Sequence, residues 1–410
     1  MEALLSRCAG LDVHQENVVA CVLYGEPGQK VNKQIRTFGT TTKALLALSD
    51  WLLKMEIRYV AMESTGVYWK PVWNVLEEEF ELVLANAQRI KHVPGRKTDI
   101  SDAQWIAKLL LNGLIEASFV PPVDIRNLRD LTRYRRSLMQ MATAQKNRIH
   151  KVLQDANIKL TSYMSNVFGV SGRLLLESIM NGESLTLEQV RRLIKTKLKV
   201  KAPKLVDALN GKVRAHHREL MRRQYDLLLV LEDNIGEIEA KIDHSVQAYK
   251  EELGLLVTVP GIDQDAAAEI LAEIGPDMTR FPTAAHLASW GGLSPGNNES
   301  AGKKKPTRTL RGDKALKSIL CQVSWAAARS KKTRLSAYYY RLVKRRGPKK
   351  ANMALAHLIL RMIYSMLKKK EPYRELGPDY LPKKKSNAEY HQRQLEKLLG
   401  YEIEIHEKTA

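Results

Sequence analysis

Hydrophobic and β-branched residues in the first 85 positions gather in short runs that are typical of strands. Polar or turn-forming residues separate the runs, and His14–Asn17 between the first two predicts a hairpin. The sequence therefore predicts five strands, at Cys8–Val13, Val18–Tyr24, Lys30–Phe38, Ile57–Met62 and Glu81–Ala85.

Three further segments of this region are predicted to be helical, Thr41–Leu53, Pro71–Glu79 and Ala103–Leu111. Together with the strands they give the order three strands, helix, strand, helix, strand, helix. This is the order of elements in the ribonuclease-H-like fold, an α/β architecture, which we predict for residues 1–120.

Two long helices are predicted after Pro121-Pro122, which ends the first domain. Arg126–Val152 has apolar residues near heptad spacing, and the segment from Val213 to Lys250 repeats them at three- and four-residue spacing. Residues 155–212 are predicted to be irregular to helical. Two interpretations stay open: a solvated antiparallel helical hairpin, and a coiled coil that dimerises and follows a nucleic-acid backbone with its basic faces.

The following region is predicted to be mainly α-helical, with helices at Thr309–Ala328 and Ala351–Lys368. At its start, Val257–Leu271 resembles a helix-hairpin-helix, in which a Pro-Gly turn offers backbone N–H groups to a DNA phosphate. Asp263 stands where that motif usually has a second glycine, so a purely structural hairpin stays open. The predicted domains are 1–120, 121–250 and 251–368, followed by a polar tail, 369–410, that is expected to be mobile.

The composition narrows the class of partner. The 410 residues include 66 Lys and Arg against 45 Asp and Glu, a formal net charge of +21. Such an excess points to a polyanion, nucleic acid before membrane, while aromatic residues at 6% argue against base stacking as the main binding mode. No apolar run is long enough to span a membrane and the N-terminus lacks a signal-peptide core, so we expect a cytoplasmic protein. Cys8, Cys21 and Cys321 form neither a disulfide framework nor a CxxC site and are expected to be reduced and structural.

Acidic residues supply the candidate chemistry. Asp99 and Asp102 are three residues apart, so on a helical turn both carboxylates leave one face. They could simply cap the helix that follows, with Asp99 as the N-cap. However, Asp12 lies in the first predicted strand and Glu63 ends the fourth. If these strands are neighbours, four carboxylates converge and would repel one another unless a divalent cation neutralises them, Mg²⁺ or its substitute Mn²⁺.

Three segments carry a family resemblance: Gly10–His14, Met62–Trp69 and Lys97–Ala103. Their sequences, order and spacing resemble the three signatures of the DEDD transposases of the IS110 family, which includes Piv-type DNA invertases and bridge-RNA-guided recombinases. The resemblance implies a RuvC-like catalytic domain and a DNA transposase or recombinase of a bacterial or archaeal insertion sequence. It further implies double-stranded donor and target DNA, a structured guide RNA, association with the nucleoid, and a homodimer or homotetramer.

The resemblance also implies a catalytic serine in the C-terminal region. That family has a serine in a Gly-Leu-(Ser/Thr)-Pro…Glu-Ser-Gly context. Gly292–Gly302 matches this context with Ser300 as the nucleophile, and with Ala301 where glycine is common in the family. By its residues alone this loop is a weak signal, because serines in Gly/Asn loops are common. Ser294 precedes Pro295 in a predicted turn and is expected to be structural. Neighbouring cations are expected to hold nucleic-acid phosphate: Lys303, Lys304, Lys305, Arg308 and Arg311.

The long helix supplies three more predicted nucleic-acid contacts, Arg129, Arg133 and Arg136. Two other functions stay open at this stage. One is a metal-dependent RuvC-like endonuclease without a covalent intermediate, in which Ser300 is structural. The other is a non-catalytic RNA-binding scaffold, although a scaffold has no use for four acids that repel one another.

Overall fold

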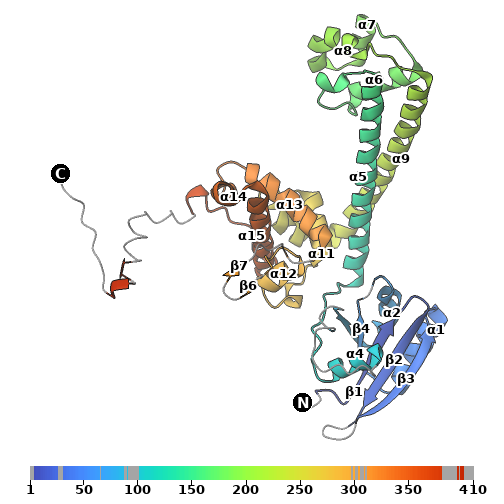
Figure 1. Ribbon diagram of the computed structural model, residues 1–410, viewed down its shortest axis with the longest axis vertical. Helices are drawn as coiled ribbons and strands as arrows, with labels where there is room; N and C mark the ends of the chain where they lie inside the picture. The colour runs from blue at the N-terminus through green and yellow to red at the C-terminus, as the bar shows by residue number, and fades with distance from the viewer. Residues whose placement is uncertain are drawn as a thin grey trace. The chain divides into compact units, whose positions relative to one another are not determined.

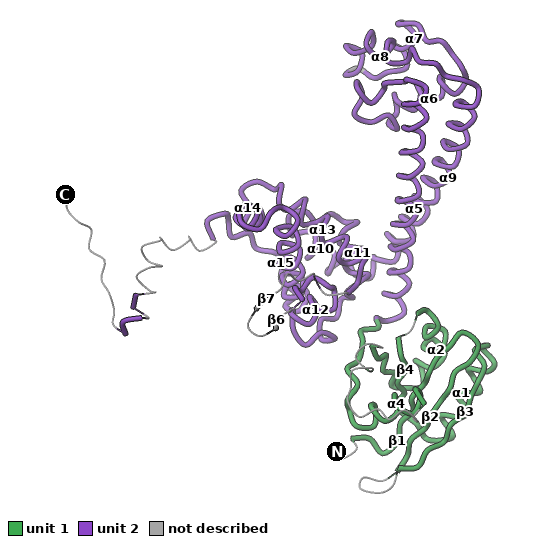
Figure 2. Tube along the Cα trace, viewed as in Figure 1, with its two compact units in different colours: residues 1–120 green, residues 121–410 purple. Residues whose placement is uncertain are grey.

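The computed structural model describes residues 4–25, 31–64, 66–86, 90, 101–296, 299–300, 303–304, 309, 312–380, 395–396 and 398–400. The chain separates into two compact units, residues 1–120 and residues 121–410 (Figure 2). Among the helices of the described residues, none combines the length and the apolar character needed to cross a membrane.

Unit 1 contains a five-stranded sheet in the order β3-β2-β1-β4-β5 (Figure 1). β1 and β3 pair antiparallel with β2, whereas β4 runs parallel to both β1 and β5. The elements are β1 (Arg7–Val13), β2 (Asn17–Tyr24), β3 (Asn32–Gly39), α1 (Thr42–Lys54), β4 (Tyr59–Glu63), α2 (Trp69–Leu76), β5 (Glu81–Ala85) and α4 (Asp102–Leu111). This is the ribonuclease-H-like topology, and the prediction made for this domain is confirmed.

The two faces of the sheet are covered by different helices. Alternate residues of β1, such as Leu11, pack into the core that includes α1 and α2, while Cys8 belongs to the core beneath α4. Gly10 lets α4 lie directly on β1, since a Cβ there would come within 2.3 Å of the Ala107 nitrogen. Burial raises the pKa of the Cys8 thiol to about 12 and that of Cys21 to about 11, in keeping with structural roles.

Unit 2 begins with two long helices packed against each other, α5 (Val123–Asp155) and α9 (Ala215–Ser245) (Figure 1). We call this pair the arm. Leu128, Leu138 and Ile149 of α5 are buried, as are Leu228 and Leu231 of α9. These apolar positions lie near heptad spacing, so the periodicity in the sequence marks the face along which the helices meet.

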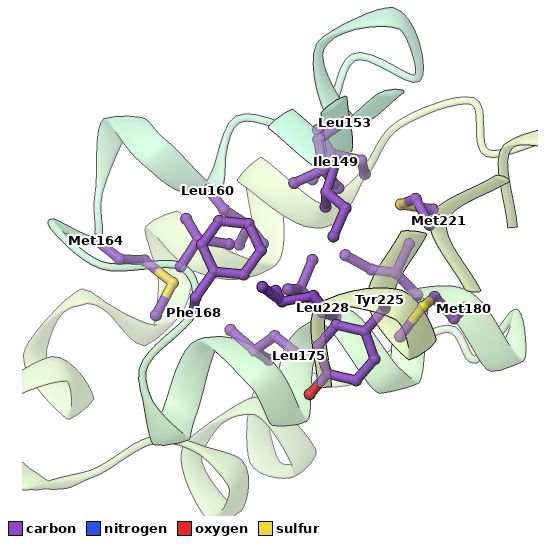
Figure 3. Close-up of a cluster of buried hydrophobic side chains, with 14 of the residues drawn as sticks. Ile149, Leu153, Leu160, Met164, Phe168, Leu175, Met180, Met221, Tyr225 and Leu228 are labelled. Carbon is purple, nitrogen blue, oxygen red and sulfur yellow. The ribbon is translucent and has the colours of Figure 1, made fainter. Parts of the chain in front are cut away.

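The chain between the arm helices, residues 156–214, forms a small folded region that we call the tip module. Its elements are η1 (Leu160–Ser162), α6 (Val170–Asn181), α7 (Leu187–Leu193), η2 (Thr196–Lys201) and α8 (Ala202–Leu209). Apolar side chains of the module, including Leu160, Phe168 and Leu175, share one core with Leu153 of α5 and Met221 of α9 (Figure 3). A stretch expected to be irregular to helical thus has a hydrophobic core where it joins the arm.

The remaining described residues of unit 2 form a mainly helical bundle. Its elements are η3 (Val246–Tyr249), α10 (Lys250–Val257), α11 (Gln264–Ile274), η4 (Met278–Arg280), α12 (Ala284–Trp290), β6 (Glu299–Ser300), β7 (Lys303–Lys304), α13 (Lys314–Arg329), α14 (Arg334–Arg346), α15 (Pro348–Lys369) and η5 (Pro378–Tyr380). The helix expected from Thr309 begins at Lys314, because the side chain of Asp313 caps it by accepting a hydrogen bond from the Leu316 nitrogen at 2.8 Å. Most of the predicted mobile tail, 369–410, lies outside the described residues.

The predicted helix-hairpin-helix corresponds to α10, a short turn and α11. Gly261 in the turn has φ +92° and packs against α13, where a Cβ would approach the Ala327 nitrogen to 2.6 Å. Asp263 caps α11 by accepting a hydrogen bond from the Ala266 nitrogen at 2.9 Å. The hairpin therefore has a structural role within the bundle, and its contact with DNA stays a prediction.

Candidate active site

Two of the predicted acids meet at one edge of the sheet. Asp12 follows Cys8 and Gly10 at alternate positions of β1, on the face that α4 covers. In the parallel ladder Leu11 pairs with Met62, so Asp12 and Glu63 come next along neighbouring strands. Glu63 is two residues beyond Ala61, which is buried in the core beneath α4. Both carboxylates therefore lie at the carboxyl ends of adjacent parallel strands and on one face of the sheet.

Asp102 comes from the helix that lies across β1. It is the first residue of α4, whose N-cap is Ser101, with the Ser101 hydroxyl accepting a hydrogen bond from the Gln104 nitrogen at 3.3 Å. The cap of α4 is thus a serine, and not Asp99 as the capping alternative required. Asp99 itself lies outside the described residues.

Electrostatics links the three described acids. Burial raises the pKa of Asp12 above its ordinary value, and the nearby charges of Asp102 and Glu63 raise it further, while His14 lowers it. The Nε2 atom of His14 lies 3.2 Å from Oδ2 of Asp12. A carboxyl whose pKa is raised by two other acids favours a cation as its neighbour.

All the donors of this cluster are carboxylate oxygens, which suit a hard divalent cation. Among the described residues, the one group of three whose potential ligand atoms all lie within 4.8 Å of one another is Asp155, His216 and His217 in unit 2. The carboxylate oxygens of Asp12, Glu63 and Asp102 are therefore spaced more widely than that. An open spacing is expected for carboxylates of like charge. The Asp12 side chain is 23% exposed, which leaves it reachable by an ion and a phosphate.

His14 also belongs to this site, although no role was predicted for it from the sequence. It stands two residues after Asp12, and its imidazole is 59% exposed beside that carboxylate. The next residue is fixed from two sides, because the Thr40 hydroxyl donates to the Gln15 carbonyl at 2.9 Å and the Tyr68 hydroxyl donates to the Gln15 side chain at 3.3 Å. The sequence could have indicated this role, because residues two apart along an extended chain, such as Asp12 and His14, have side chains on the same face.

The predicted serine lies in a short β-hairpin of unit 2. β6 and β7 pair antiparallel with Ser300 opposite Lys303 and Glu299 opposite Lys304. A bridge between Pro295 and Thr309 joins the flanking chain. The other cations predicted here, Lys305, Arg308 and Arg311, lie outside the described residues.

The arginines predicted to contact nucleic acid are engaged with protein groups. Arg133 holds Glu273 through two hydrogen bonds, Nε to Oε1 at 2.8 Å and Nη2 to Oε2 at 2.7 Å, and its Nη2 also donates to Asp313 at 2.7 Å. Arg129 donates to the backbone carbonyl of Glu273 at 2.6 Å, and Arg136 donates to the Ala315 carbonyl at 3.0 Å. Their guanidinium groups thus connect α5 to α11 and α13, and the expectation that these three residues contact nucleic acid stays a prediction.

Carboxylates of α9 and α11 complete this set, which we call the root network. Glu273 is only 2% exposed, and burial raises its pKa while Arg133 and Arg129 lower it. Arg135 pairs with Glu239 and with Asp265, each at 2.6 Å, and Glu269 accepts from Arg136. A buried acid needs such partners, because an unpaired charge in the interior is strongly unfavourable.

Asp155, His216 and His217 are structural in their present arrangement. Nδ1 of His217 accepts a hydrogen bond from the Arg214 nitrogen at 3.2 Å, and its Nε2 lies 2.8 Å from Oδ2 of Asp155. Both ring nitrogens of His217 are therefore already used. The contact ties the end of α5 to the start of α9.

Comparisons with known proteins agree with this picture of two units. Residues 9–158 match the family model described as a transposase of the DEDD IS110 type, and residues 253–340 match that of the IS116/IS110/IS902 transposase family. The two matches together cover more than half of the chain.

Individual relatives point the same way. The chain is 23% identical over 328 residues to the transposase for insertion sequence element IS1111A from Coxiella burnetii, covering 78% of this chain and 80% of the relative. It is 31% identical over 140 residues, 32% of each chain, to an insertion element IS110 protein of 43.6 kDa from Streptomyces coelicolor. Among solved structures, RuvC of Thermus thermophilus is 13% identical, with a TM-score of 0.19 over 28% of this chain and 84% of that one.

Proposed function

Since the chain belongs to the IS110 family of transposases, enzymes that cut DNA, we propose that Asp12, Glu63, Asp99 and Asp102 form its divalent-metal site. The observation that carries the proposal is the position of Asp12 and Glu63 at the ends of adjacent parallel strands, with Asp102 of α4 close enough for its charge to raise the pKa of Asp12. The bound ion would supply charge neutralisation and polarisation of the scissile phosphodiester.

Mg²⁺ is the ion that this donor set fits best, and Mn²⁺ can replace it. The four carboxylates would hold it, and Gly10 supports them by letting α4 approach β1, so that Asp102 stays near Asp12. His14 would hold one oxygen of Asp12 and leave the other available.

We also propose that Ser300 is the nucleophile. Its Oγ would attack the phosphorus and form a phosphoserine diester, while the bond from phosphorus to the leaving DNA oxygen breaks and that oxygen takes up a proton. A hydroxyl of a second DNA end would later attack the same phosphorus, release the serine and join the strands. The position of Ser300 opposite Lys303 in the β6–β7 ladder supports this, because a lysine nearby favours an approaching phosphate.

RNA guidance and assembly are parts of the same proposal. A structured guide RNA would select the donor and target DNA, and a homodimer or homotetramer would hold both. The net charge of +21 supports binding of this much polyanion by one chain. An antiparallel coiled-coil arm is a candidate dimerisation element.

The metal site is tested by replacing each acid with its isosteric amide. Asp12→Asn, Glu63→Gln, Asp99→Asn and Asp102→Asn should each lower the DNA cleavage rate by more than about a hundredfold and weaken Mn²⁺ binding, measured by calorimetry. Asp50→Asn is a matched control, because Asp50 is exposed on α1, which packs on the other face of the sheet. A variant that cleaves DNA within about tenfold of the original rate would remove that acid from the site.

The serine is tested by trapping its adduct. Ser300→Ala should form no covalent protein–DNA species on denaturing gels with end-labelled DNA and Mg²⁺, whereas Ser294→Ala, the matched control, should form it. If Ser300→Ala cleaves DNA at the original rate, water is the nucleophile, and the alternative of a RuvC-like metal-dependent endonuclease takes the place of the recombinase.

A further inference from the structure

The tip module exposes a strongly basic surface segment, residues 191–204. It contains seven Lys and Arg and no Asp or Glu. The side chains of these seven residues are all exposed, and we call them the tip patch: Arg191, Arg192, Lys195, Lys197, Lys199, Lys201 and Lys204.

Little of this charge is used in contacts with other described residues. Among the described residues, the recorded contacts of these seven side chains are an exposed ion pair of Arg192 with Glu188 at 2.9 Å and a hydrogen bond from Lys201 to the Tyr163 carbonyl at 3.2 Å. An exposed pair between residues four apart stabilises a helix only slightly. The remaining cations therefore face water.

The fold of the module does not require these cations. Its buried residues in this segment are apolar, Ile194 and Ala202, and the lysines lie between and around them. Seven like charges held on one small folded surface repel one another, which opposes folding unless an anion neutralises them. A polyanion with regularly spaced charges fits this arrangement better than a small ligand does.

We propose that the tip patch binds the phosphate backbone of double-stranded DNA. The family to which the chain belongs cuts DNA, and five of the seven cations are lysines, which contact phosphate as point charges without reading bases. In the described part of the tip module, no aromatic side chain is among the exposed large hydrophobic ones. Recognition of unpaired RNA relies on such rings, so a duplex backbone is the better match.

The length of the arm determines how far the DNA contact at the tip patch lies from the bundle. α5 has 33 residues and spans about 50 Å at about 1.5 Å per residue. The root network joins one part of α5 to the bundle, whereas the C-terminal end of α5 enters the core of the tip module. The tip patch therefore binds DNA well away from the bundle.

The experiment compares two triple variants of the full chain. Lys195→Glu, Lys197→Glu and Lys199→Glu together should weaken binding of a 40-base-pair duplex by about tenfold to a hundredfold near 100 mM salt, measured by fluorescence anisotropy. The control carries the same change of net charge at exposed lysines elsewhere in unit 2, Lys241→Glu, Lys250→Glu and Lys369→Glu. Binding is measured with EDTA present, so the result does not depend on the proposed metal site or serine.

Duplex affinities of the two triple variants decide whether the tip patch binds DNA. The control triple should bind the duplex within about threefold of the original protein, and a loss as large as that of the tip variant would show a net-charge effect and overturn the proposal. An unchanged duplex affinity of the tip variant would also overturn it. A structured RNA of equal length is titrated in parallel, and a loss confined to that RNA would assign the tip patch to RNA instead. Circular dichroism of both triples confirms that the helices remain, and Lys→Arg at the three tip positions should restore binding.

Discussion

The two ends of the arm use positive charge in opposite ways. At the root, four arginines of α5 meet carboxylates and backbone carbonyls of neighbouring helices, and Glu273 among them is almost fully buried. At the tip, seven cations within fourteen residues are exposed, and only two of them have a recorded side-chain contact within the described protein. Both groups contribute equally per residue to the formal net charge of +21, so the net charge does not distinguish them.

The difference teaches that residue type and packing decide what a charge does. Arginine has a planar fork that binds a carboxylate through two hydrogen bonds and keeps its charge when desolvated. Lysine is a compact charge on a flexible stem and retains its hydration at a surface. Arginine at the root therefore fits a structural joint, and lysine at the tip fits a transient contact with phosphate.

The largest expected effect is at the root. Glu273→Ala removes the carboxylate that Arg129 and Arg133 share, leaves Arg133 with Asp313 alone, and should lower the free energy of unfolding by about 3 kcal/mol. Urea denaturation followed by circular dichroism measures this. Stability within about 0.5 kcal/mol of the original would show that the root arginines are solvated like those of the tip.

A smaller effect is expected where the tip module meets the arm. Glu232 of α9 accepts from Arg173 at 2.7 Å and from Lys146 at 3.0 Å. Burial alone would raise its pKa, but these two cations lower it below its ordinary value. Its contribution to stability is therefore present above the pKa of the unfolded chain and is lost as the pH falls through the lower, folded value.

Glu232→Gln should remove this pH dependence. Because the side chain is about one-third exposed, the loss near pH 7 should be about 1 kcal/mol or less. Denaturant midpoints of the variant and the original protein should converge once the pH falls below the folded pKa of Glu232, which lies under its ordinary value. A difference that persists at low pH would mean that Glu232 acts through packing and not through its charge.

The smallest effect on stability is expected at the tip itself. Lys197→Ala should change the free energy of unfolding by less than about 0.5 kcal/mol, since the side chain has no recorded contact among the described residues. The same variant should lower the slope of log affinity for duplex DNA against log salt by about one. A clear loss of stability without a change in slope would place Lys197 with the structural cations of the root.

The sequence was sufficient to predict the ribonuclease-H-like domain, because its strands and helices are short, distinct and connected in a diagnostic order. It also predicted the long helices of the arm from heptad spacing. It could not assign Arg133, whose partners Glu273 and Asp313 lie 140 and 180 residues away. It did not predict α14, because Lys and Arg dominate the last turn of this helix. The tip module was also unclear, because its short helices carry no long periodic pattern and are stabilised by a core shared with α5 and α9.

The contact between Asp155 and His217 makes the segment between α5 and α9 easy to replace, in evolution and by design. It joins the residue where the polypeptide leaves α5 to one near the start of α9, so the chain departs and returns at nearly the same point. Segments with adjacent ends can be gained, lost or exchanged with little disturbance of the surrounding fold. Homologues should therefore vary in length at this position more than elsewhere in the arm. A short glycine-containing turn in place of residues 157–213 should leave the root network in place, whereas Leu153 and Met221 would lose their apolar partners in the tip module.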